Sequence, residues 1–150
     1  VRCECQRRPP PRFSGATARL PGGSRRPAGT IAAVPGRLAA TYLFSRECPS
    51  HEEGLRLLRE TAAAQDLELE LDVVEVRDDR DAEARGFPGS PTYLLAGRDP
   101  FPREDGGHAP RADACRAYAL PGGRIGPLPH PDDLAEALRS AARAAAKEGT

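Results

Sequence analysis

Cys48 is the residue of this chain whose type and position are best suited to chemistry. It follows a short apolar run, residues 41–44, and precedes a Pro49-Ser50-His51 segment that is typical of a helix start. A thiol at the N-terminus of a helix is stabilised as the thiolate by the unpaired N–H groups and the helix dipole. We therefore predict that Cys48 is a helix N-cap and a nucleophile. The alternative is that it packs as a small apolar residue at a strand end.

His51 stands where the second cysteine of a Cys-x-x-Cys pair would stand. As a catalytic residue it would tune the Cys48 thiolate or pass a proton to a leaving thiol. Alternatively, it lies solvated on the first helical turn. The negative charges of Glu47, Glu52 and Glu53 oppose ionisation of the thiol. The neighbourhood therefore predicts a modestly activated thiol.

Cys115 is the second candidate thiol, on a predicted strand that also carries Asp113. If the fold brings it to Cys48, the two sulfurs could cycle between dithiol and disulfide or bind one soft metal ion. The alternative is that Cys115 is core packing. Cys3 and Cys5 are isolated near the N-terminus, and we interpret them as incidental. The chain has no zinc-binding pattern and no phosphate-binding loop, so we predict no metal ligands and no cofactor.

The elements that must position these residues are visible in the hydrophobic pattern. Residues 67–73 alternate strictly between apolar and acidic residues, which is typical of a strand. Leu55, Leu58 and Ala62 recur at helical spacing after Cys48. Gly86 is a plausible left-handed cap for a short charged helix. We expect strands at 37–45, 67–76, 91–96 and 112–120, and helices at 49–65, 78–85 and from 131 to about 145. The predicted order is β-α-β-α-β-β-α, an α/β fold.

Composition divides the chain into two parts. Residues 1–40 carry eight Arg against Glu4 alone and are broken by Pro-Gly segments, whereas the remainder is acidic overall. We predict that 1–36 is a disordered basic arm, or sequence upstream of the true start, and that 37–150 is one domain. No apolar run reaches the length of a membrane span, and the domain has no basic field for nucleic acid. We expect a cytoplasmic protein that binds neither membrane nor nucleic acid.

The segment 86–95, Gly-Phe-Pro-Gly-Ser-Pro-Thr-Tyr-Leu-Leu, carries a family resemblance. It resembles the glycine- and proline-containing segment that precedes a strand in thioredoxin-like proteins, and Cys48-Pro49 lies at the matching distance before it. The resemblance covers 37 to about 145. It implies a central mixed four-stranded sheet with flanking helices. It also implies a cis bond before Pro91, and a substrate backbone paired with Ser90 beside Pro91.

A narrower resemblance rests on four short motifs. Cys48-Pro49, Gly-Ser-Pro-Thr at 89–92, Gly-Arg-Asp-Pro-Phe at 97–101 and Cys-Arg-Ala-Tyr at 115–118 are similar to motifs of small actinobacterial thioredoxin-like proteins, often labelled alkylmercury lyase. This label implies handling of organomercurials or Hg(II) by Cys48 and Cys115. Asp113 would then be the acid.

From the residues and the resemblance together, we expect a monothiol-type thiol/disulfide oxidoreductase. Cys48 would attack a disulfide or accept a glutathionyl group, and the mixed disulfide would be resolved by an outside thiol such as glutathione, or by Cys115. Two alternatives remain open. One is a binding module that keeps the fold without the reaction, and the other is the mercury chemistry.

Overall fold

A computed structural model of the protein describes residues 37–103 and 109–149. The predicted arm, with Cys3 and Cys5, lies outside the described residues. The described elements follow the order β-α-β-α-β-β-β-α: β1 (Arg37–Phe44), α1 (His51–Ala63), β2 (Glu68–Glu75), α2 (Asp79–Arg85), β3 (Thr92–Leu95), β4 (Tyr118–Leu120), β5 (Arg124–Gly126) and α3 (Pro131–Glu148). The three predicted helices and the first three strands are confirmed, each within about three residues of the expected ends.

The main sheet has three strands in the order β2-β1-β3. β1 runs parallel to β2 and antiparallel to β3, so β1 is the central strand. This central position gives β1 a hydrogen-bonded neighbour on each side, and side chains on both of its faces are buried. Leu38 and Tyr42 on one face and Leu43 on the other are at most 2% exposed.

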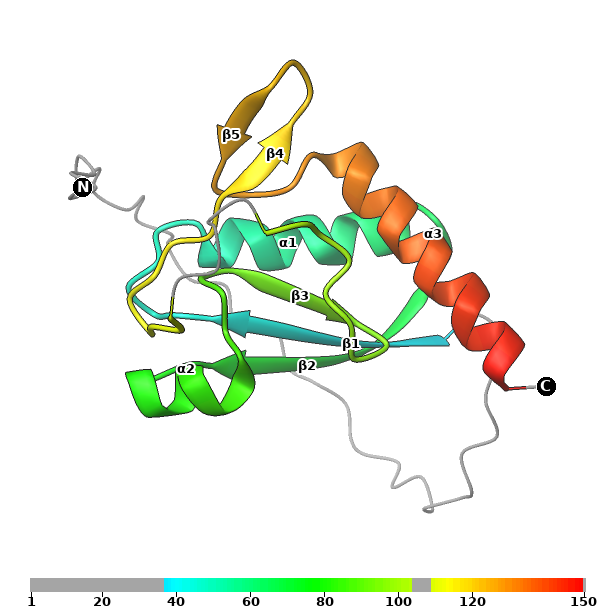
Figure 1. The fold of residues 1–150 in the computed structure, drawn as a ribbon. Helices are drawn as coiled ribbons and strands as arrows, with labels where there is room; N and C mark the ends of the chain where they lie inside the picture. The colour runs from blue at the N-terminus through cyan, green and yellow to red at the C-terminus, as the bar shows by residue number, and fades with distance from the viewer. Residues whose placement is uncertain (1–36, 104–108, 150) are drawn as a thin grey trace, which may run out of the picture. The chain divides into compact units, whose positions relative to one another are not determined.

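Two helices pack together on one face of this sheet. The larger core cluster joins β1 and β3 to α1 through Leu58 and to α3 through Leu134 and Leu138. Figure 1 shows α1 and α3 on the same side of the strands. The opposite face has a smaller cluster, in which α2 contributes Ala82 and Phe87 follows its left-handed cap. The site described below lies where β1 ends and α1 begins.

The prediction of a fourth strand in the main sheet is wrong. Within 112–120, only Tyr118–Leu120 is a strand, and β4 pairs antiparallel with β5 in a separate two-stranded sheet. The turn between them has two glycines with positive φ, Gly122 and Gly123, a conformation that glycine adopts readily. The chain before β4 is held instead by an isolated bridge to Ser90, so Cys115 is not on a strand of the main sheet.

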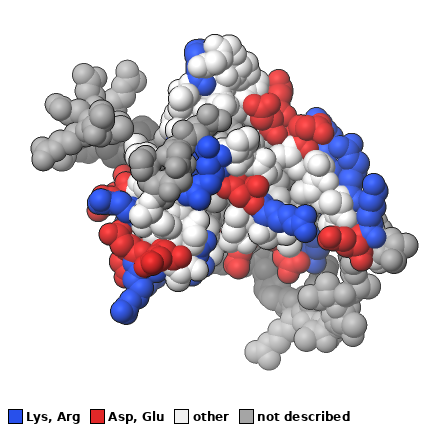
Figure 2. All heavy atoms as spheres, viewed as in Figure 1, with Lys and Arg blue, Asp and Glu red and all other residues white. Residues whose placement is uncertain are grey.

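Charged side chains of both signs are interspersed on the face of the domain that Figure 2 shows. On α3, Asp132 and Asp133 lie in the first turn, where negative charge suits the helix dipole, and arginines follow further along the helix. Within the described ranges, no helix is both long enough and apolar enough to cross a membrane.

Candidate thiol site

Cys48 lies in a tight turn between β1 and α1. Its N–H donates to the carbonyl of Ser45 at 3.0 Å, and its own carbonyl accepts from the N–H of His51 at 3.3 Å. The prediction that Cys48 is the N-cap is wrong, because the N-cap is Ser50 and the helix begins at His51. The physical reason is the two consecutive turns, which delay the first helical residue and place the thiol beneath the helix start. Cys48 is 7% exposed.

The thiol contacts the segment that precedes β3. Cys48 Sγ is 3.6 Å from the carbonyl oxygen of Ser90, in a buried hydrogen bond in which the thiol donates. Ser90 Oγ in turn accepts from the N–H of Ser45 at 2.9 Å. The peptide bond between Ser90 and Pro91 is cis. Residues 45–48 and 90–91, which are far apart in sequence, therefore form one compact cluster.

Ser90 also pairs with the segment that contains Cys115. The Ser90 N–H donates to the carbonyl of Ala114 at 2.8 Å, and the Ser90 carbonyl accepts from the N–H of Arg116 at 3.1 Å. This is a parallel bridge between Ser90 and Cys115. Both backbone groups of Ser90 are therefore engaged within the chain. The same carbonyl oxygen receives the Cys48 thiol and the Arg116 amide.

The two candidate thiols differ in access. Cys115 is exposed, whereas Cys48 is buried, and neither is in a disulfide. Paired strand residues lie about 4.7–4.9 Å apart and direct their side chains to the same face. The Ser90 side chain is directed to the turn at Ser45, so the bridge directs the Cys115 side chain toward the turn that contains Cys48.

The segment around Cys115 is packed closely and anchored. A Cβ added to Gly89, which has φ +140°, would lie 2.8 Å from the Arg116 amide nitrogen and 3.0 Å from the Cys115 carbonyl carbon. Only glycine lets these backbones approach so closely. Arg116 provides the anchor. Its guanidinium, 3% exposed, pairs with Asp99 at 2.6 Å and also donates to Thr92 Oγ1 and the Phe101 carbonyl.

Arg116 and Asp99 are residues that sequence reasoning missed. Each belongs to one of the four short motifs, Gly-Arg-Asp-Pro-Phe and Cys-Arg-Ala-Tyr, and the structure brings these two motifs together. The guanidinium of Arg116 lies 4.7 Å from the Tyr118 ring centroid, and that ring packs edge-on against Phe101. The signal available in the sequence was that each motif has a charged residue two positions before an aromatic one, and that the two charges are opposite.

Two buried tyrosines lie beneath the first turn of α1. Tyr42 Oη donates to the His51 carbonyl at 2.6 Å, and Tyr93 Oη donates to the Gly54 carbonyl at 3.1 Å. Burial raises the pKa of Tyr42, and the nearby Cys48 raises the pKa of this phenol further. Burial also raises the pKa of Tyr93. Both phenols are therefore neutral hydrogen-bond donors that hold the helix start over the thiol.

His51 is the first residue of α1, but its imidazole is turned toward Phe44. The two rings are stacked with their centroids 5.0 Å apart. In the part of the chain that the structure describes, no hydrogen bond joins the imidazole to the Cys48 thiol. The structure therefore connects His51 to Cys48 only through its backbone N–H.

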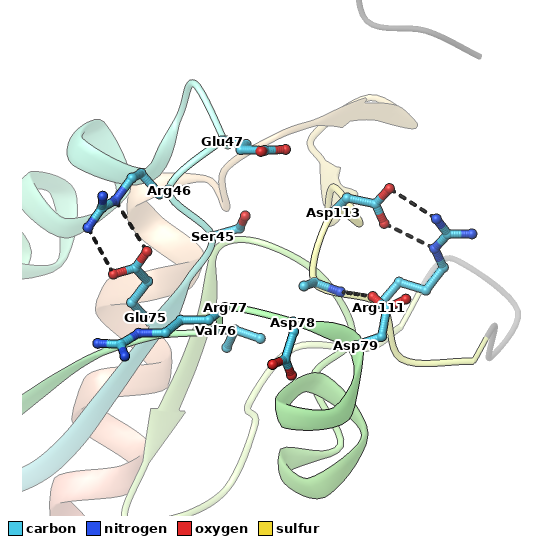
Figure 3. Close-up of a pocket in the computed structure, with 11 residues that line it drawn as sticks. Ser45, Arg46, Glu47, Glu75, Val76, Arg77, Asp78, Asp79, Arg111 and Asp113 are labelled. Atoms are coloured by element: carbon cyan, nitrogen blue, oxygen red, sulfur yellow. Dashed lines mark hydrogen bonds and ion pairs between the residues drawn. The ribbon is translucent and has the colours of Figure 1, made fainter.

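An open cavity of about 770 Å³ lies between the two cysteine-bearing segments. Ser45, Arg46 and Glu47 line one side, Arg111, Ala112 and Asp113 line another, and the residues after β2 complete it. Figure 3 shows the Arg46–Glu75 ion pair on one side and the Arg111–Asp113 pair on the other.

The ion pair with Arg111 influences the protonation state of Asp113. The hydrogen bond with Arg111 lowers the pKa of Asp113, so this side chain is ionised at neutral pH. As the acid of the mercury reaction, Asp113 would therefore first have to take up a proton. In the described residues, no group of three or more His, Cys, Asp or Glu side chains is arranged to hold a metal ion.

Comparisons with models of protein families, with curated proteins and with solved structures find no match to this chain. The fold and the site geometry are therefore the basis for the function proposed below.

Proposed function

We propose that this protein is a thioredoxin-like thiol/disulfide oxidoreductase in which Cys48 and Cys115 form the redox-active pair. The observation that carries the proposal is the convergence of both cysteines on Ser90. The Cys48 thiol donates to the Ser90 carbonyl, and Cys115 is bridged to the same residue. A disulfide needs Cα atoms about 4.4–6.8 Å apart, and this shared contact is our basis for proposing a bond between Cys48 and Cys115.

The architecture supports this proposal. Strand order β2-β1-β3, with a parallel and an antiparallel pair and two helices on one face, is what the thioredoxin-like resemblance implies for the centre of the fold. The Cys48 turn and the Ser90–Pro91 segment meet, as this resemblance also implies. The separate β4–β5 sheet departs from the four-stranded arrangement.

The hydrogen bonds of Ser90 favour a small substrate. An extended peptide that paired with Ser90 would have to displace residues 114–116, because both backbone groups of Ser90 are already engaged. A small disulfide such as glutathione disulfide needs no such strand pairing. We therefore propose small disulfides RSSR, other than glutathione disulfide itself, as substrates and glutathione as the co-substrate. In each cycle one RSSR and two glutathione molecules become two RSH and one glutathione disulfide.

The proposed reaction is a two-electron exchange. One thiolate of the pair attacks the substrate disulfide, which forms a mixed disulfide and releases one thiol. The second thiolate then attacks the protein sulfur of that mixed disulfide, which closes the Cys48–Cys115 disulfide and releases the second thiol. Two glutathione molecules reduce this bond again and leave as glutathione disulfide.

A single-turnover oxidation tests this function. The reduced protein, with Cys3 and Cys5 replaced by Ser, is mixed with one equivalent of glutathione disulfide. We expect two equivalents of glutathione per protein and a peptide map that shows the Cys48–Cys115 bond. The Cys48→Ser and Cys115→Ser variants should retain a glutathionyl adduct or stay unreacted. A parent protein that releases no glutathione would refute the proposal.

The burial of Cys48 supports a second candidate, a binding module that retains the fold without the reaction. At 7% exposure, the Cys48 thiol has little access to a substrate. Alkylation of Cys48 measured against pH separates the two functions. An inert thiol over the whole pH range, together with no glutathionylation of either cysteine, would favour the binding module.

A further inference from the structure

The solvent accessibility of the two cysteines indicates the order in which they react. Exchange requires a thiolate to approach a disulfide sulfur directly, so the rate depends on access as well as ionisation. Cys115 is exposed, whereas Cys48 is 7% exposed and directed at the Ser90 carbonyl. A disulfide from solvent therefore meets Cys115 first.

Cys115 is exposed, but the segment that contains it is anchored. The backbone on both sides of Cys115 is hydrogen-bonded to Ser90, and the following residue, Arg116, is 4% exposed and paired with Asp99. The close approach of Gly89 leaves no room for the segment to move inward. Cys115 is thus held at the surface beside Ser90.

We propose that Cys115 is the entry thiol, which attacks the substrate, and that Cys48 is the resolving thiol. This inference rests on the proposed function and deepens it. The Cys115 thiolate attacks one sulfur of a substrate RSSR, forms Cys115–S–S–R and releases RS⁻. The Cys48 thiolate then attacks the Cys115 sulfur, forms the Cys48–Cys115 disulfide and releases the second RS⁻. The protein loses two electrons and the substrate gains two.

This order gives the burial of Cys48 a physical role. A resolving thiol reacts only with a sulfur that is already inside the protein, so it needs no access to solvent. Its hydrogen bond to the Ser90 carbonyl holds it beside the segment on which the mixed disulfide forms. By contrast, an entry role for Cys48 would require local opening to expose the buried thiol before each reaction.

The experiment uses the full chain with Cys3→Ser and Cys5→Ser as parent, and DTNB as the disulfide probe. Release of the coloured thiolate is followed by stopped flow, and adducts are located by mass spectrometry. We expect Cys48→Ser to release one equivalent instead of two and to keep a stable adduct on Cys115. We expect Cys115→Ser to react at least about tenfold more slowly, since local opening must precede attack on the buried thiol.

The opposite pattern overturns the inference. If Cys115→Ser reacts at the parent rate and carries its adduct on Cys48, then Cys48 is the entry thiol, and the proposed function still stands whenever the parent closes the Cys48–Cys115 bond. If the parent releases one equivalent and forms no internal bond, the proposed function itself fails. Circular dichroism of each variant verifies the fold, and thiol counts in denaturant verify that both preparations are reduced.

Discussion

Replacing Asp99 with Asn should loosen residues 114–116, the segment bridged to Ser90, whose carbonyl accepts from the Cys48 thiol. The Arg116 guanidinium, 3% exposed, is held by two contacts to Asp99 at 2.6 and 3.0 Å, and Asp99 itself is 24% exposed. Breaking a buried ion pair from one side costs about 3–5 kcal/mol. Asn keeps one accepting oxygen and Asp99 is partly solvated, so we expect a loss of about 2–3 kcal/mol in the free energy of unfolding.

The same loss should appear locally as faster modification of Cys48. If residues 114–116 open more easily by 2 kcal/mol or more, the reaction of Cys48 with iodoacetamide should accelerate at least about tenfold, since each 1.4 kcal/mol is a factor of ten. The assay uses the Cys3→Ser, Cys5→Ser, Cys115→Ser background, in which Cys48 is the only thiol. Urea denaturation on the same samples gives the free energy of unfolding.

The control is Glu136→Gln on α3, which also removes a carboxylate from arginines. Arg139 and Arg143 are 49% and 66% exposed, so solvent screens their pairs with Glu136, and these pairs should contribute little to the free energy of unfolding. This variant should leave the Cys48 rate unchanged. The reasoning is refuted if Asp99→Asn unfolds within 0.5 kcal/mol of its parent, roughly the surface-substitution range, and alkylates Cys48 no faster.

Three further predictions address the packing, the phenols and the charges of the site. Gly89→Ala should lower the free energy of unfolding, measured by urea denaturation, by about 2–4 kcal/mol, because the added Cβ meets the backbone of Cys115 and Arg116. Gly122 also has positive φ but has open space around it, so Gly122→Ala should cost about 1 kcal/mol. Burial raises the pKa of all three tyrosines, so folding favours their neutral form. The contribution of the neutral phenols to the free energy of unfolding is therefore lost as pH rises above about 10. Absorbance at about 295 nm should therefore rise together with the loss of helical circular dichroism, and ionisation near the free tyrosine pKa of about 10 with the helices intact would contradict this. The double substitution Glu47→Gln, Asp113→Asn removes two negative charges from the site. It should speed the reaction with anionic DTNB about twofold to fivefold and slow the reaction with cationic cystamine, and added salt should reduce both effects. Equal changes for both probes would disprove this prediction.

The sequence was sufficient for the elements whose signals are local. The alternation before Val74 gave β2, the helical spacing after His51 gave α1, and Gly86 ended α2 as expected, with φ +59°. These patterns succeed because burial of one face dictates the period of apolar residues.

The elements that were predicted wrongly depend on contacts with residues distant in sequence. Residues 112–117 have an apolar content compatible with a strand, but Arg116 is directed into the protein to Asp99. Among the described residues, the only β-bridge of this segment is the one to Ser90. The N-cap was misplaced because Cys48 and Pro49 form turns ahead of the helix. No local pattern reports either arrangement.

For the candidate site, the sequence pointed to residues that the structure brings together, but not to the contacts between them. Cys48, Ser90 and Cys115 were each singled out, and the structure places them in contact through the Ser90 backbone. The stacking of His51 on Phe44 and the difference in access between the cysteines became visible only in three dimensions.

A redox titration of the parent protein in glutathione buffers tests most directly whether Cys48 and Cys115 act as one pair. The account predicts a single two-electron transition, with the oxidised form carrying one internal disulfide and no bound glutathione, and loss of that transition in either single variant. Independent glutathionylation of the two cysteines across the titration, with no bond between them, would contradict it.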